Sequence, residues 1–445
     1  MNKMRDEVKI NDTMQVRPRY SLVRAMLIVR QVETLASRKA VFEEIKSKNR
    51  IIRWVDGIYA FGGTFLVRRV MLFLYMVKCT AALRETGGPK TRAIAMANFA
   101  NEVHTIERVT ALLPEYEIAL MRPSIRNALR LAQVLAMGRM IGTLPRIWPI
   151  LGVMARRHSF MPACRISSAL AYYIRFGEVL QNRPPDTTAI VASNYSPESV
   201  GFAAAAHCHN RKVVYINHAP VPRNALYVPP VLADLSVFHG AFVKETYETR
   251  SICITQAVYI GQSGKALAMT FPQTLSCVGI FLTALTRKDT ILRLIAEIRA
   301  VYPDVDILIR HHPVALLETD LSSLSSDDRI QVTIGAPLEG DIAACDVIIC
   351  GNSGVVLNAL RGGRPVAYVP ELDEILFDYN GFCEKQLVPR IAKWDADTLE
   401  ALNAFYSVPM WSSVMVGYDA SYGKSAQVLD KEVRDSLISV LGPRS

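Results

Sequence analysis

The feature that most constrains the fold is a pair of short apolar runs, each of which ends in a group of polar or glycine residues. Residues 306–309 lead into Arg310, His311, His312 and Pro313, and residues 346–350 lead into Gly351, Asn352, Ser353 and Gly354. Apolar runs of this length bounded by turn residues are typical of buried parallel strands. Because open α/β sheets bind ligands beyond the carboxyl ends of such strands, both groups are expected at a binding site.

Short apolar runs alternate with helical periodicity from residue 184 onward. Expected strands span 188–192, 212–216, 233–238, 278–284, 305–310, 330–334, 347–350 and 365–369, and expected helices span 199–209, 241–250, 289–302, 338–344, 354–361 and 398–406. This alternation predicts an α/β fold of two Rossmann-like domains with parallel sheets that face each other across a cleft. Glycine and proline cluster at 256–273, so we expect an N-terminal domain at 1–260, Rossmann-like over about 184–260, and a C-terminal domain with a final helix at 261–445.

The first 180 residues are expected to be mostly helical, with helices at 22–44, 64–84, 93–113 and 125–139. Residues 1–100 contain 19 Lys and Arg against 8 Asp and Glu, whereas the whole chain has a net charge of +10. A basic region of this kind predicts contact with an anionic membrane surface or an anionic polymer, and a solvated basic face is the alternative. No nucleic-acid-binding motif is present, so a nucleic acid is not expected as a partner.

Cysteine usage and segment lengths indicate a cytoplasmic protein. The eight cysteines form no CxxC pair and are expected to be reduced and buried. No stretch reaches the ~20 apolar residues of a spanning helix, and no secretory signal is apparent. We therefore expect a cytoplasmic location, with the basic region as the basis for peripheral attachment to the inner face of the inner membrane.

The glycine-rich segment at 351–354 is expected to bind a phosphate. It precedes an apolar helix, whose first backbone N–H groups carry partial positive charge. Ser353 supplies a hydroxyl donor, and Gly351 and Gly354 permit close approach. The alternative is an ordinary helix N-cap by Ser353.

The second strand end offers an imidazole and a guanidinium. His312, followed by the rigid Pro313, is placed to hydrogen-bond a leaving phosphate, with help from Arg310 or His311. The alternative role of His312 is to hold the turn.

Glu339, at the start of the helix after 330–334, is expected to accept hydrogen bonds from ribose hydroxyls, or to stabilise the helix dipole.

The first domain provides two candidate general bases. His218 ends a strand in the segment Asn217-His218-Ala219-Pro220, and Glu198 follows the neighbouring strand. Either one is placed to take a proton from an acceptor hydroxyl. Asp234 and His239 are weaker candidates.

Residues 190–395 resemble the GT-B glycosyltransferases of bacterial surface and capsular polysaccharide synthesis. The resemblance rests on His312-Pro313, Asn352-Ser353-Gly354 and residues 359–366. It extends to the sialyl-, polysialyl- and Kdo-transferases that use CMP-activated sugars, and it implies that His312 and Ser353 contact the donor phosphate. It also implies a nucleotide-sugar donor, which is a substrate and not a cofactor, and a glycan or glycolipid acceptor.

Two other families share parts of this pattern. The sialyltransferases use an acidic base in a motif of two acidic residues and glycine, and residues 194–198 are the segment of this chain that would occupy that loop. The CDP-glycerol glycerophosphotransferases use a His-Gly base motif, to which His218-Ala219 is similar. The UDP-N-acetylglucosamine 2-epimerases carry a Ser-Gly-Gly loop, from which Ser353-Gly354-Val355 departs.

The sequence thus predicts an inverting GT-B transferase that uses a CMP-sugar in surface polysaccharide or lipooligosaccharide synthesis. The absence of a clear DxD-like pair of carboxylates predicts a reaction without a metal. The alternatives are a CDP-glycerol-type phosphotransferase, a sugar-nucleotide epimerase and a non-catalytic GT-B-like partner of an assembly complex.

Overall fold

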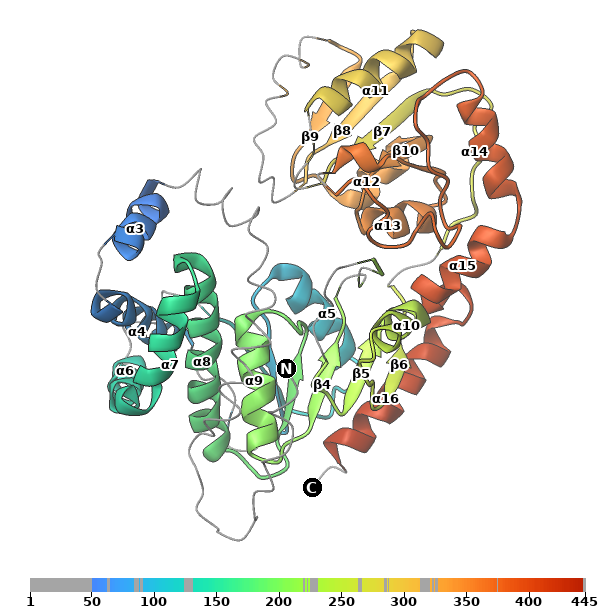
Figure 1. Cartoon of the computed structure of the whole chain (residues 1–445). Helices are drawn as coiled ribbons and strands as arrows, with labels where there is room; N and C mark the ends of the chain where they lie inside the picture. The colour runs from blue at the N-terminus through green and yellow to red at the C-terminus, as the bar shows by residue number, and fades with distance from the viewer. Residues whose placement is uncertain are drawn as a thin grey trace.

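The chain forms two α/β units, each built on a sheet of parallel strands (Figure 1). The computed structural model describes residues 50–442 except 62–64, 84–87, 89–90, 124–130, 219–220, 222, 225–230, 263–265, 284–285, 287, 313–320, 322–323, 325–326 and 374. The first sheet has six strands in the order β2-β1-β3-β4-β5-β6, and the second has five in the order β11-β10-β7-β8-β9. All their strand pairs are parallel, which confirms the predicted α/β class.

The first sheet is built from short apolar strands covered on both faces. Its strands are β1 (Ala93–Met96), β2 (Ile118–Met121), β3 (Thr188–Val191), β4 (Val213–Ile216), β5 (Leu235–Phe238) and β6 (Ala257–Tyr259). Helices α5 (Ala100–Thr110), α9 (Pro197–Cys208) and α10 (Ala241–Thr249) follow β1, β3 and β5. Ser196 caps α9, because its hydroxyl accepts from the backbone N–H of Ser199, and Pro197 opens the helix.

The helix predicted at 93–113 is wrong in its first part. Residues Ala93–Met96 form the buried strand β1, and α5 begins only at Ala100. Alanine and methionine favour a helix by intrinsic propensity, but complete burial between β2 and β3 outweighs that preference. The carboxylate of Glu102 then accepts from the backbone N–H groups of Asn98 and Phe99, which fixes the start of α5.

The second sheet agrees with the predicted strands and helices. Its strands are β7 (Cys277–Phe281), β8 (Asp306–Arg310), β9 (Ile330–Thr333), β10 (Val347–Cys350) and β11 (Val366–Tyr368). Its helices are α11 (Lys288–Val301), α12 (Leu338–Ala344) and α13 (Val355–Arg361). Apart from Asp306 and Arg310 at the two ends of β8, the three central strands are apolar and almost fully buried, as parallel strands covered on both faces must be.

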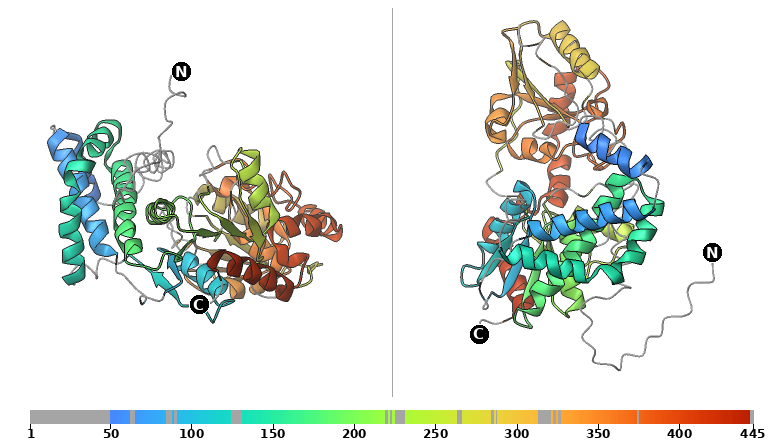
Figure 2. Two further views of the ribbon diagram at one scale, coloured as in Figure 1. Left: turned by 90° about the horizontal axis from the view of Figure 1, so that it is seen from below. Right: turned by 90° about the vertical axis from the view of Figure 1, so that its left-hand side faces the viewer.

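A helical layer covers the first domain on one side (Figure 2). It consists of α3 (Arg50–Phe61), α4 (Phe65–Ala82), α6 (Leu131–Gly142), α7 (Leu144–Arg157) and α8 (Phe160–Gln181). Helix α8 packs on α9 of the sheet, and α4 packs on α8 between α6 and α7. Within the part of the chain that the structure describes, no helix is long and apolar enough to cross a bilayer. The helix predicted at 22–44 lies outside that part.

The C-terminal helices return from the second domain to the first (Figure 1). They are α14 (Thr398–Ser407), α15 (Met410–Tyr418) and α16 (Ala426–Leu441). Helix α16 contacts β5 and β6 and buries Val433, Leu437 and Leu441 in the core of the first sheet. The domain division at 260/261 stays a prediction. In the structure, β1 and β2 are strands of the first sheet, and α16 packs against that sheet.

Candidate functional site

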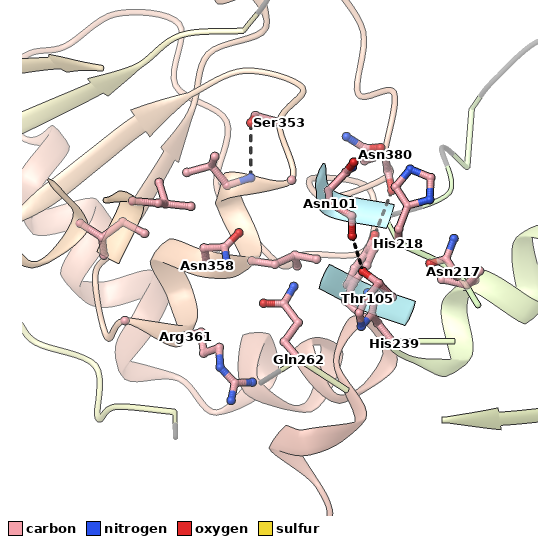
Figure 3. A pocket seen from close by; sticks show the side chains of 18 of the residues that line it. Asn101, Thr105, Asn217, His218, His239, Gln262, Ser353, Asn358, Arg361 and Asn380 are labelled. Atoms are coloured by element: carbon pink, nitrogen blue, oxygen red, sulfur yellow. Dashed lines mark hydrogen bonds between the residues drawn. The ribbon is translucent and has the colours of Figure 1, made fainter. Parts of the chain in front are cut away.

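A cleft of about 810 Å³ lies between the two domains. The first domain lines it with residues that follow β4 and β5 and with one side of α5, and the second lines it with residues that follow β8 and β10. Figure 3 shows Ser353, Asn358 and Arg361 on one side and Asn101, His218 and His239 on the other. The carboxyl ends of both sheets therefore face each other, as the sequence predicts.

Ser353 lies at the cleft, just before the start of helix α13. Its Oγ accepts a hydrogen bond from the backbone N–H of Val355, the first residue of α13, at 3.3 Å. The N-cap of α13 is Gly354, so Ser353 does not occupy the N-cap position considered from sequence. Because Oγ acts as an acceptor there, its own proton stays available as a donor toward the cleft. Ser353 and Gly354 both line the cleft.

Gly351 and Asn352 do not line the cleft. The amide of Asn352 donates to the carbonyl oxygens of Ile375 (2.8 Å) and Phe377 (3.0 Å). Its Oδ1 accepts from the hydroxyl of Tyr368 and the backbone N–H of Tyr379, both at 2.8 Å. These four bonds use both ends of the amide, so Asn352 anchors the 375–379 segment.

His312 lines the cleft at the end of β8, whereas the neighbouring Arg310 is engaged in a buried network. The Arg310 guanidinium pairs with the carboxylate of Asp341 and donates to the carbonyl of Ala336 at 2.8 Å. The hydroxyl of Thr333 donates to the same Asp341 oxygen at 2.8 Å. Arg310 therefore reaches the cleft wall but mainly holds β8, β9 and α12 together.

The other residues of that strand end contribute less. His311 is not among the residues that line the cleft; its backbone N–H donates to the carbonyl of Thr333, and burial lowers the pKa of its imidazole. Pro313 lies outside the described residues. Glu339 is exposed on the first turn of α12 and lines the cleft.

His218 enters the cleft from the first domain in a defined tautomer. Its Nδ1 contacts the carbonyl oxygen of Ala192, which can only accept, so Nδ1 carries the proton. In the neutral ring Nε2 then bears the lone pair. The ring also lies 6.4 Å from that of Tyr195. His218 therefore has the form that a general base requires.

Glu198 lies away from the cleft lining, in the second position of α9. It is 4% exposed, and its Oε1 has no hydrogen-bond partner among the described residues. Burial raises the pKa of this carboxyl, and the nearby Glu102 carboxylate adds to the rise. The structure thus does not bring this second candidate base together with His218.

The two weaker candidates separate in the same way. Asp234 pairs with Lys212 at 3.1 Å and accepts from the backbone N–H of Val213, outside the cleft lining. His239 lines the cleft, and its Nδ1 donates to the carbonyl of Gly261 at 2.8 Å. Burial lowers the pKa of His239, which favours a neutral ring.

Six cationic side chains line the cleft, namely Arg108, Arg223, Arg310, Arg361, Arg364 and Lys385, and Glu339 supplies a carboxylate. Four of the six pair with carboxylates beside the cleft: Arg223 and Lys385 with Glu245, Arg310 with Asp341, and Arg361 with Asp419. Arg108 donates to the carbonyls of Gly261 (2.7 Å) and Ile260 (3.1 Å), and burial lowers its pKa. Carbonyl partners orient the guanidinium without neutralising it. The positive charge of Arg108 favours an anionic ligand such as a phosphate in this cleft.

Several lining residues were missed by sequence reasoning. Asn101 and Thr105 on α5 were hidden by the wrong helix boundary, and Gln262 lay in the expected interdomain linker. Asn358 on α13 points its amide into the cleft (Figure 3). The boundary of α5 could have been found from the apolar run Ala93–Met96, because it is followed by polar residues as the other strands are.

The described residues contain no group of three or more His, Cys, Asp and Glu side chains that could hold a metal ion. All eight cysteines are free, and Cys253 is exposed, contrary to the expected burial. The sulfurs of Cys277 and Cys345 lie 4.0 Å apart.

Neither a family model nor a curated protein sequence matches the chain. Among solved structures, it is similar to the calicheamicin glycosyltransferase, with 14% identity over 80% of this chain and 100% of that one, and a TM-score of 0.49. It is similar to UDP-GlcNAc 2-epimerase from Neisseria meningitidis bound to UDP-GlcNAc, with 13% identity over 78% and 99% of the two chains and a TM-score of 0.48. It is also similar to MnaA of S. aureus in a structure with UDP, with 10% identity over 79% of this chain and 98% of that one, and a TM-score of 0.48.

Proposed function

We propose that the chain is an inverting transferase that moves a sugar from a nucleotide donor, first of all a CMP-sugar, to an acceptor hydroxyl in bacterial surface polysaccharide or lipooligosaccharide synthesis. The observation that carries the proposal is that one cleft is lined by His218 from the first domain and by Ser353 and His312 from the second. One side holds a proton acceptor, and the other holds donors suited to a phosphate.

In this mechanism His218 acts as the general base. Its Nε2 takes the proton of the acceptor hydroxyl while the hydroxyl oxygen attacks the anomeric carbon of the donor. The bond between that carbon and the phosphate oxygen breaks, and its electron pair leaves with the nucleotide. A single displacement of this kind inverts the anomeric configuration.

The second domain stabilises the leaving phosphate. Ser353 donates its hydroxyl proton, and His312, when protonated, donates an N–H and offsets the developing negative charge. Arg108, whose hydrogen-bond acceptors are the carbonyls of Ile260 and Gly261, contributes positive charge at the cleft. Glu339, exposed at the rim, accepts from the ribose hydroxyls. No step in this scheme uses a metal, and EDTA is therefore expected to leave the rate unchanged.

A phosphotransferase that uses a CDP-activated polyol is the second candidate. The observation that favours it is that the base available in the cleft is a histidine, His218, whereas the acidic Glu198 does not line the cleft. In that reaction the acceptor oxygen attacks the phosphorus distal to the cytidine. The bond to the bridging oxygen breaks, and CMP leaves.

Nucleotide release separates these candidates. The protein is incubated with CMP-, CDP-, UDP- and GDP-activated substrates, with and without a glycolipid and polysaccharide extract, and products are identified by mass spectrometry. Acceptor-dependent release of CMP from a CMP-sugar supports the first proposal, and the same release from CDP-glycerol supports the second. Conversion of a UDP-sugar without acceptor identifies an epimerase, and no turnover of any substrate identifies a non-catalytic protein.

A further inference from the structure

Helix α4 exposes an apolar stripe on the side of the molecule away from the first sheet. Leu66, Val70 and Leu74 follow one another at intervals of four residues and are 61%, 41% and 60% exposed. Residues four apart lie on the same face of a helix. The opposite face of α4 buries Leu72 and Met76 completely. The helix is thus apolar on two sides. One side packs inside the protein, and the other is exposed.

The exposed apolar surface continues onto the helices beside α4. Val134, Leu135 and Ile141 of α6 and Val153 of α7 are between 47% and 56% exposed. Both helices contact α4. The guanidinium of Arg156 on α7 lies 5.1 Å from the ring centroid of Phe65, itself 48% exposed on α4. We call the exposed residues of α4, α6 and α7 the α4 face.

The charge of the α4 face has one sign. Helices α4, α6 and α7 contain seven cationic residues and no Asp or Glu: Arg68, Arg69, Lys78, Arg139, Arg146, Arg156 and Arg157. Lys78, Arg146, Arg156 and Arg157 are exposed. Arg139 is also exposed but pairs with Glu178 of α8. An apolar surface bordered by cations requires a partner that is both apolar and anionic.

We propose that the α4 face binds the surface of an anionic lipid bilayer. The helices would lie in the plane of the interface, with the apolar stripe at the acyl boundary and the cations against the headgroups. Trp54 of the adjacent α3, 68% exposed, is the residue type that occupies this depth. A second copy of the chain fits less well, because a two-fold interface brings like-charged residues together. The inference does not depend on the proposed transferase activity.

Vesicle sedimentation tests this assignment. The full chain is mixed with vesicles of phosphatidylcholine alone or with phosphatidylglycerol added. Binding is expected to the anionic vesicles, and to weaken as salt rises, because exposed charges are screened. The triple substitution Leu66→Gln, Val70→Gln, Leu74→Gln is expected to lower binding by at least about tenfold, since it removes the apolar contribution. The matched control is Val408→Gln, Met410→Gln, Val428→Gln, which alters three exposed apolar residues elsewhere.

Two results would overturn the assignment. The first is equal sedimentation of the wild-type chain with neutral and anionic vesicles, or none with either. The second is a wild-type dimer, detected by light scattering, that the α4 triple substitution dissociates without any effect on lipid binding. The charge variant Arg156→Glu, Arg157→Glu keeps the test valid should the triple variant fail to fold, and it too is expected to lose anionic binding by at least about tenfold.

Discussion

Nη1 of Arg361 lies 2.7 Å from Oδ2 of Asp419, and the two side chains are only 7% and 0% exposed. Oδ1 of the same carboxylate accepts from the backbone N–H groups of Gln262 (2.9 Å) and Ser421 (3.0 Å). The chain leaves the first domain after β6, next to Gln262, and returns after α15, next to Asp419. Asp419 therefore connects the two segments that cross between the domains, and it also binds Arg361, a residue of the cleft wall.

Asp419→Asn is expected to destabilise the protein by about 3–5 kcal/mol, because it leaves the buried Arg361 charge without its partner. Urea unfolding measures this change. Glu432→Gln is the matched control, because it breaks an exposed ion pair in which the side chain of Lys424 is 50% exposed and that of Glu432 is 43% exposed. This substitution is expected to lower the free energy of unfolding by less than about 1 kcal/mol. Equal losses in the two variants would contradict a role for Asp419 as an interdomain anchor.

Glu198→Gln is expected to stabilise the protein increasingly as pH rises. Burial raises the pKa of Glu198 in the folded chain, so the folded state binds more protons than the unfolded state. The wild-type protein therefore loses stability as pH rises above the unfolded pKa of about 4.3, and the neutral glutamine removes that loss. Unfolding at pH 5 and pH 8 measures the difference. A large loss of turnover in a folded Glu198→Gln protein would instead identify Glu198 as the base.

Asn352→Ala is expected to loosen the 375–379 segment. The substitution removes all four hydrogen bonds of the amide, at a cost of about 2 kcal/mol or more. Faster hydrogen exchange at 375–379 is the direct measurement. Asn403→Ala, which removes a single bond to Pro272, serves as the control. Loss of nucleotide affinity with unchanged exchange would show that Asn352 contacts the ligand itself.

His218→Gln is expected to lower the turnover number by about 10²–10⁴-fold, the range for removal of a general base. Nucleotide affinity is expected to stay within about twofold, because the base acts on the acceptor and not on the donor phosphate. His104→Gln, a substitution of another histidine in the same cleft, controls for changes in the lining. An unchanged turnover in His218→Gln would remove His218 from the mechanism.

The second domain was largely predictable because its physical signals are local. The strands at 306–310 and 347–350 contain continuous apolar runs bounded by turn residues, and the segments that follow them place His312 and Ser353 at the cleft. Helix α16 and strand β1 depend instead on distant partners. Leu437 is buried against a sheet formed more than 170 residues earlier, and Ala93–Met96 becomes a strand only between β2 and β3. Asn352 and Glu198 were polar residues at strand ends whose side chains turn to structural contacts, which sequence position does not reveal.

The central claim is that Ser353 and His312 hold the phosphate of a nucleotide donor. Calorimetric titration of CMP, CDP, UDP and GDP into the wild-type chain, Ser353→Ala and His312→Ala tests it most directly, with Ser412→Ala on α15, outside the cleft lining, as control. We expect one nucleotide class to bind, and its affinity to fall by about 10- to 100-fold in both site variants but not in the control, since a hydrogen bond to a charged group contributes about 1.5–3 kcal/mol. Binding that both site variants retain in full, or no binding of any nucleotide, would contradict the account.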